Sequence, residues 1–104
     1  MACAIFYRVP SVAALADDLE RLMQLCGPRG AGLGADFYGT RHAPREVQSA
    51  ADYPRITEEL LRRGHSEAQV KKILGENFLA FFARVEAVRD QLVNEPPSTA
   101  VYTK

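Results

Sequence analysis

The spacing of apolar positions changes along the chain and marks its elements. Residues 2–9 are short, apolar and aromatic, which predicts a β-strand. From residue 12 to residue 26, apolar side chains recur at spacings of three and four, which predicts a helix with one apolar face. Ser11 is a candidate N-cap for this helix, and Gly27 is a candidate stop.

Residues 31–37 return to the two-residue period of an extended strand. One face carries Ala31, Leu33, Ala35 and Phe37, and the other carries Gly32, Gly34 and Asp36. The second face is nearly bare, and bare strand faces occur where another backbone or a ligand comes close. Strand, helix and strand in this order predict a βαβ unit with parallel strands.

The second half of the chain predicts a loop followed by helices. Residues 39–54 show no clear period, and long loops of this kind are often functional. Helical spacing returns at 55–63, and Ser66 with Gln69 forms a capping box for a further helix. We expect the apolar face of that helix to be core or a packing surface. It consists of Val70, Ile73, Leu74, Phe78, Phe81, Phe82, Val85 and Val88.

Length and charge narrow the number of domains and the classes of partner that this chain can have. The 104 residues allow one domain at most, and the polar, proline-broken segment 94–104 predicts a disordered tail after a folded unit at 1–93. Thirteen basic and thirteen acidic residues leave no net charge, which argues against a nucleic-acid partner. No apolar run approaches the length of a membrane span, and residues 1–10 lack a signal-peptide pattern, which favours the cytoplasm.

Asp36 is the strongest candidate for a catalytic residue. It stands at the carboxyl end of a predicted parallel strand, where α/β folds place catalytic groups. A strand-end aspartate that only caps a turn is the competing interpretation, and pattern alone favours it. Cys3 and Cys26 provide neither a disulfide framework nor a four-ligand zinc site. Cys26 lies on the apolar face of its helix, so we expect it in the core.

Two blocks of the sequence resemble one known family. Residues 32–39, GLGADFYG, resemble the G-[IL]-G-S-D-F-D-G signature of the membrane dipeptidases, which are zinc peptidases of the renal-dipeptidase type. Residues 51–88 resemble the C-terminal signature of that family, YP-x-[IL]-T-x-x-L-L-x-R-G-[YF]-S-E-x-x-[IV]-x-K-I-L-G-x-N-[FL]. The helix at 12–26 is similar to the one before the signature strand, so the resemblance covers 12–88.

The resemblance implies a (β/α)8 (TIM) barrel with two zinc ions at its mouth. This chain would supply only the last strand, at 31–37, and the closing helices, at 55–88, because a whole barrel needs about 250 residues. The matching aspartate of the family moves a proton during amide hydrolysis. Asp36 is therefore implied as the catalytic residue and a dipeptide as the substrate.

Departures from the family pattern concern the metal and the substrate. The zinc ligands of the family include an H-x-D pair and further histidines from earlier in the chain, and this sequence contains neither H-x-D nor H-x-H. We therefore expect no metal ligand in this chain. Tyr38, in place of an acidic residue, and His42, in the loop, are weak substrate-binding candidates. His65 replaces an aromatic residue of the family and is expected to be an exposed turn residue.

Two functions stay open at this stage. The chain is the C-terminal part of a zinc dipeptidase, inactive by itself, or a non-enzymatic remnant that self-associates or binds a partner protein. Metal content and size in solution separate the two. In either case the open edges of the predicted sheet favour self-association or pairing with a complementary barrel fragment.

Overall fold

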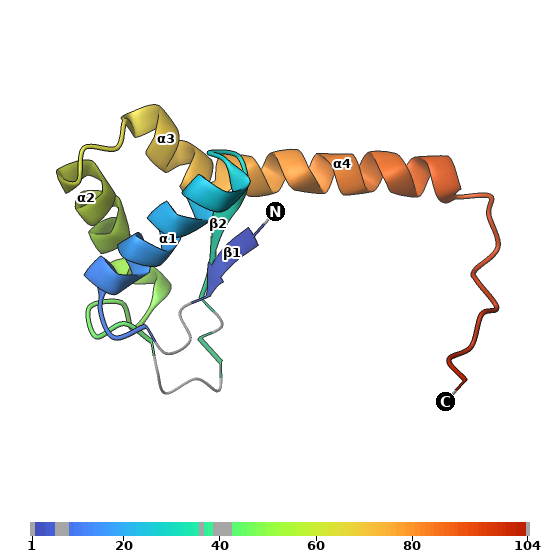
Figure 1. Cartoon of the computed structure of the whole chain (residues 1–104), viewed down its shortest axis with the longest axis horizontal. Coiled ribbons are helices and arrows are strands. Elements are labelled where there is room, and N and C mark those ends of the chain that lie inside the picture. The colour runs from blue at the N-terminus through green and yellow to red at the C-terminus, as the bar shows by residue number, and fades with distance from the viewer. Residues whose placement is uncertain (1, 6–8, 36, 39–42, 104) are drawn as a thin grey trace.

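The chain begins with a parallel pair of strands joined by a helix (Figure 1). The computed structural model describes residues 2–5, 9–35, 37–38 and 43–103. In chain order the elements are β1 (Ala2–Ile5), α1 (Val12–Cys26), β2 (Ala31–Gly34), η1 (Ala50–Asp52), α2 (Pro54–Arg62), α3 (Glu67–Lys71), η2 (Lys72–Glu76) and α4 (Asn77–Leu92). The short element η1 is a 3-10 helix and η2 is a π-helical turn.

The predicted βαβ unit is confirmed. β1 and β2 run parallel, with Ala2 beside Ala31 and Ile5 beside Gly34, and α1 connects them. The described part of each strand is shorter than its predicted range, and residues 6–8 lie outside the described residues. The coarse class is therefore a small, helix-rich α/β domain.

The ends of α1 follow from local sequence signals. At its start, the Ser11 hydroxyl accepts a hydrogen bond from the backbone N–H of Ala14 at 3.2 Å. At its end, Gly27 has a φ of 76°, a left-handed conformation that glycine adopts without steric cost. Gly30 closes the turn, and a Cβ placed there would lie 2.4 Å from the Cβ of Cys26. The turn between α1 and β2 therefore requires glycine at position 30.

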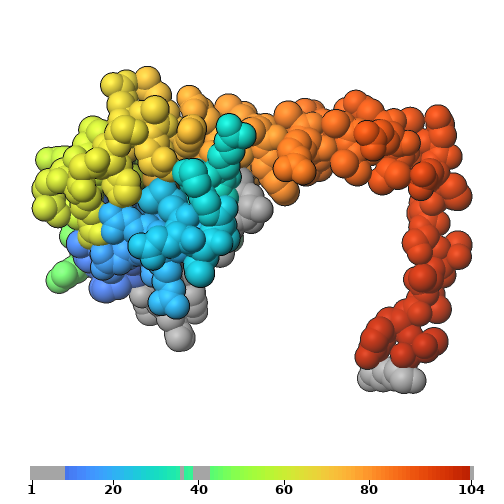
Figure 2. Space-filling view, turned by 45° about the horizontal axis from the view of Figure 1, so that its top comes forward, coloured from blue at the N-terminus to red at the C-terminus, as the bar shows by residue number. Residues whose placement is uncertain are grey.

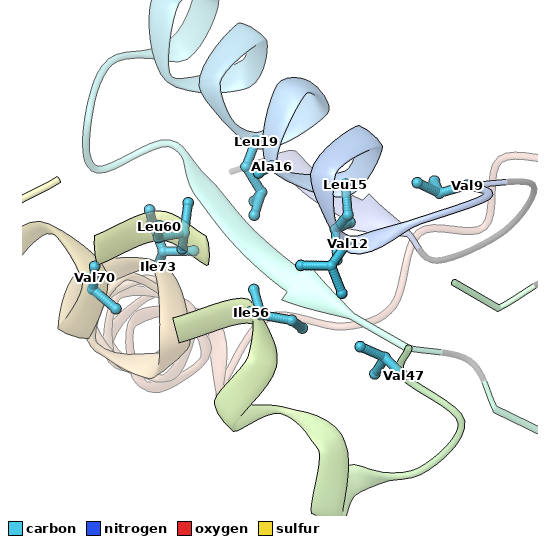
Figure 3. Packing of buried hydrophobic residues seen from close by; sticks show 10 residues of the cluster. All are labelled: Val9, Val12, Leu15, Ala16, Leu19, Val47, Ile56, Leu60, Val70 and Ile73. Atoms are coloured by element: carbon cyan, nitrogen blue, oxygen red, sulfur yellow. The ribbon is translucent and has the colours of Figure 1, made fainter. Parts of the chain in front are cut away.

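The hydrophobic core lies between α1, α2 and the start of the long C-terminal helical segment (Figure 3). Its buried members are Val9, Val12, Leu15, Ala16, Leu19, Val47, Ile56, Leu60, Val70 and Ile73. The predicted apolar face of β2 contributes as expected. Ala31 is fully buried, and Leu33, Ala35 and Phe37 are partly buried and pack against the cluster or its rim.

The segment predicted as a loop is more ordered than its sequence indicates. Pro44 and Val47 are fully buried, although no period marks them as core positions. The carboxylate of Asp52 accepts hydrogen bonds from the backbone N–H groups of Gln48 and Ser49, both at 3.1 Å, and η1 follows Ser49 directly. The structure therefore replaces part of the predicted loop with a capped 3-10 turn.

The long helix α4 leaves the body of the protein after its first turn (Figures 1 and 2). Asn77 is its buried residue. Most large apolar side chains beyond it are between 43% and 51% exposed, Leu79 is 67% exposed, and Leu74 just before the helix is 40% exposed. We call this surface the apolar helical stripe. It consists of Leu74, Phe78, Phe81, Phe82, Val85, Val88 and Leu92. Of the two expectations for this face, core is wrong beyond Ile73, because the described elements lie alongside no more than the first turns of α4. That it is a packing surface stays a prediction.

Cys26 also corrects a prediction. Its spacing places it on the apolar face of α1, but it is the last residue of that helix, and it is an exposed free cysteine. Beyond Leu92, the described residues form no further helix or strand, and disorder of the tail at 94–104 stays a prediction. Among the described residues, no helix combines the length and apolar character needed to cross a membrane.

Candidate functional site

The carboxyl end of β2 is the candidate catalytic edge. Asp36 and His42 lie outside the described residues, so their predicted roles stay predictions. Next to Asp36, the ring of Phe37 lies 6.3 Å from the ring of Tyr53, measured between centroids and tilted by 53°. Tyr38 is 97% exposed. The chain on the far side of Asp36 is therefore anchored by Phe37 against the residue that precedes α2.

The segment at 43–49 folds over the start of α1. The backbone N–H of Arg45 donates to the carbonyl of Pro10 at 3.3 Å. The carboxylate of Glu46 accepts a hydrogen bond from the backbone N–H of Val12 at 3.2 Å. A carboxylate is favourable at a helix N-terminus because the first amides are unpaired and carry partial positive charge. This contact fixes the chain that follows the candidate edge.

Arg63 is the centre of a charged cluster that joins α2 to α1. Its guanidinium is within 2.7 Å of the carboxylates of Asp17 and Glu59 and within 3.0 Å of Glu20. It also donates to the backbone carbonyl of Ala13 at 2.9 Å. The Arg63 side chain is only 18% exposed, so these contacts replace water as its partners. The cluster aligns the end of α2 on α1.

The ion pairs of the charged cluster shift the pKa values of its members. Hydrogen bonds from Arg62, and then from Arg63, lower the pKa of Glu59 from 4.5 to about 2. The hydrogen bonds that Arg63 donates to Glu59, and then to Asp17, raise the pKa of Arg63. The ion pairs therefore hold Glu59 ionised well into the acid range.

Acid is therefore expected to remove a stabilising contribution from Glu59. Because the folded pKa is lower than the unfolded one, this contribution is present above about pH 4.5 and is lost as pH falls toward 2. Replacing Arg62, the largest cause of the shift, by Gln should make the loss of thermal stability between pH 5 and pH 2 smaller. Melting temperatures measured across that range test this.

Arg21→Gln is the matched control for that experiment. Arg21 is exposed and lies outside the charged cluster, so its replacement should leave the acid dependence unchanged. An Arg62→Gln variant with the same acid profile as the parent chain would show that Glu59 does not carry the effect.

His65 joins the charged cluster as well. Its Nε2 lies 2.8 Å from a carboxylate oxygen of Glu20, and its side chain is 21% exposed. The expectation of an exposed turn residue is therefore wrong, because the turn after α2 packs His65 against α1. Among the described residues, no group of three or more His, Cys, Asp or Glu side chains is placed to hold a metal ion. Those residues do not fit a zinc centre.

Asn77 is a positioning residue whose hydrogen-bond partners the sequence pattern did not predict. It is only 6% exposed, and its side-chain amide donates to the carbonyls of Pro28 at 3.0 Å and of Ala31 at 2.8 Å. These bonds attach the α1–β2 turn to the start of α4. The available signal was a polar residue within an otherwise apolar helical face.

Comparison with known proteins shows which family this sequence is similar to. The sequence profile described as "Membrane dipeptidase (Peptidase family M19)" matches residues 7–96. "Dipeptidase aclJ" of Aspergillus oryzae is 36% identical over 87 residues, which are 84% of this chain and 21% of that protein. "Dipeptidase 3" of Rattus norvegicus is 30% identical over 92 residues, which are 88% of this chain and 19% of that protein.

The matches cover most of this chain but only a small part of each relative. The chain spans about a fifth of the length of the curated relatives that it matches. The profile match nevertheless includes β2 and all the helices from α1 to α4. The chain therefore belongs to the membrane dipeptidase family, peptidase family M19.

Proposed function

We propose that residues 31–37 form the last strand of a (β/α)8 dipeptidase barrel and that Asp36 provides its acid–base carboxylate. The parallel β1–α1–β2 unit carries this proposal, because (β/α)8 barrels are built from such units. Their catalytic groups come from the carboxyl ends of the strands. Asp36 follows shortly after Gly34, the last residue of β2.

The proposed chemistry is hydrolysis of a dipeptide. In this role the Asp36 carboxylate accepts a proton from the attacking water and returns it to the leaving amine. An ionised carboxylate can do both, because its oxygens accept a proton and its acid form donates one. The described residues do not fit a zinc centre. We therefore assign the zinc ions implied by the family to ligands carried by the rest of a complete barrel.

The apolar helical stripe supports a second candidate function. In a complete barrel, the stripe would pack against elements that this chain lacks. In the chain alone, seven large apolar side chains stay at least 40% exposed along one helical segment, and exposed apolar patches often mark interaction sites. The alternative is therefore a non-enzymatic remnant that associates through this stripe, with a second copy or with a partner protein.

A chimeric enzyme separates the two candidates. In the Aspergillus oryzae relative, the matched fifth of the protein is replaced by this chain. The chimera is expected to hydrolyse dipeptides, whereas the chain alone should show neither hydrolysis nor stoichiometric zinc, because its described residues bring no ligand set together. Activity assays and metal analysis of both proteins are the measurements.

The parent relative serves as the positive control of that experiment, and circular dichroism checks that the chimera folds. A folded chimera without hydrolysis would favour the non-enzymatic remnant. Hydrolysis or tightly bound zinc in the chain alone would overturn the assignment of the missing ligands to the rest of a barrel.

A further inference from the structure

A cavity of about 420 Å³ lies between the α1–β2 turn and the start of α4. The turn stands beside the beginning of α4 in the space-filling view (Figure 2). The walls include Cys26 and Arg29 from the turn, and Lys72, Phe81 and Arg84 from the helical segment. Since the turn leads into the first residue of β2, this cavity lies at the amino end of that strand, whereas the candidate catalytic edge is at its carboxyl end.

The two walls of the cavity are held in place by specific contacts. Asn77 bonds the carbonyls of Pro28 and Ala31, on either side of Arg29 and Gly30, to the start of α4. The close approach of Gly30 to Cys26 keeps the turn tight, because a side chain at position 30 would collide with Cys26. The cavity is thus formed by the fold itself, and a ligand would not need to order its walls first.

The helical wall of the cavity contains the π-helical turn η2. Its first and last residues, Lys72 and Glu76, both line the cavity. π-Helical turns are rare, and they are found frequently at functional sites. Here the wide turn places Lys72, Glu76 and Asn77 along one wall. The irregular backbone therefore indicates a functional site here, independently of the charges of the lining residues.

The charge of the cavity differs from that of the whole chain. The chain has no formal net charge, but three cations, Arg29, Lys72 and Arg84, line the cavity with one carboxylate, Glu76. Among the described residues, none of these three cations forms an ion pair. The lining therefore carries a net charge of +2 that no described side chain neutralises.

The geometry points to a binding site for a small organic dianion, and specifically for a phosphate monoester with an apolar or aromatic group. A phosphate monoester carries a charge of about −1.5 to −2 at pH 7, which matches the excess charge of the lining. Arginine suits phosphate because its planar donors form paired hydrogen bonds. The Phe81 ring and Ala80 supply an apolar wall for the remainder of the ligand, and the volume suits a small molecule.

Titration of the chain with phenyl phosphate at low salt tests this site. Calorimetry should give tighter binding for phenyl phosphate than for benzenesulfonate, a monoanion, and tighter binding for both than for neutral benzyl alcohol. Lys72→Gln and Arg84→Gln should each weaken phenyl phosphate binding by about three- to fivefold, as expected for partly exposed charge pairs. Glu76→Gln should strengthen it, because it removes the opposing carboxylate.

Lys72→Gln and Arg84→Gln are expected to weaken binding, whereas Glu76→Gln is expected to strengthen it. A general loss of folding would weaken binding in all three variants, so it can be told apart from the proposed effect. Arg21→Gln is the control, since this exposed arginine of α1 lies outside the cavity, and it should leave binding unchanged. Equal binding of the dianion and the monoanion would overturn the proposal. So would a Glu76→Gln variant that binds more weakly, or an Arg21→Gln variant that loses as much affinity as Lys72→Gln.

Discussion

Replacing Asp36 by Asn is expected to lower dipeptide hydrolysis by about 10²–10⁴-fold in the chimeric barrel described above. The amide has nearly the shape of the carboxylate, so the strand end and the binding of substrate should change little. It neither accepts nor releases a proton near neutral pH, so the proton transfer between water and leaving amine is lost. Steady-state kinetics should therefore show a fall in kcat with little change in KM.

Asp18→Asn is the matched control for this variant. Asp18 is an exposed residue of α1, and its replacement should leave kcat and KM unchanged. Circular dichroism of both variants checks that the barrel still folds. Retained hydrolysis in a folded Asp36→Asn chimera would remove Asp36 from the proposed mechanism.

The chain alone is expected to self-associate at micromolar concentration, and a single glutamate in the apolar helical stripe should abolish most of that association. Phe82 is half exposed, and its ring stacks on that of Phe78 with centroids 6.0 Å apart. A Phe82→Glu substitution places a charge in a surface that associates by excluding water, and burying an unpaired charge is strongly unfavourable. Sedimentation or light scattering measures the change in mass.

The control for the stripe is Ala83→Glu. Ala83 lies on α4 next to Phe82, but its helical position is on the other side of the helix from Val85 and Phe78. Ala83→Glu adds the same charge to the same helix but outside the apolar helical stripe, so it should leave the association intact. A strictly monomeric parent chain would contradict the prediction, as would equal effects of the two substitutions.

Elements with local signals could be predicted from the sequence. Helix α1 is an example, because the Ser11 cap, the spacing of its apolar residues and Gly27 all lie within or next to it. The parallel pairing of β1 and β2 followed from the strand–helix–strand order. Burial in the segment at 43–49 could not be predicted, because Pro44 and Val47 are covered by elements distant in sequence.

Exposure was harder to predict than helicity. The spacing of apolar residues correctly predicted the helices that carry Cys26 and Phe78. Spacing alone does not say whether another element covers the apolar face of a helix, and both residues are exposed. The candidate site shows the same limit. Asp36 was proposed from its position at a strand end and from the family signature, and its role stays a prediction. The contacts of Arg63 with Asp17 and of Asn77 with Ala31 could not be predicted, because they appear only when distant segments are brought together.

The Glu46 carboxylate at the start of α1 has a consequence for the order of folding. Ser11 caps the helix from within its own sequence, whereas the partner of the Val12 amide lies 34 residues further along the chain. Closing a loop of that length costs entropy, so this contact can form only after the intervening segment has collected around the core. The first turn of α1 is thus completed by a late event. Its amide protons report on the opening of the 43–49 segment, and the middle of the same helix reports on global unfolding.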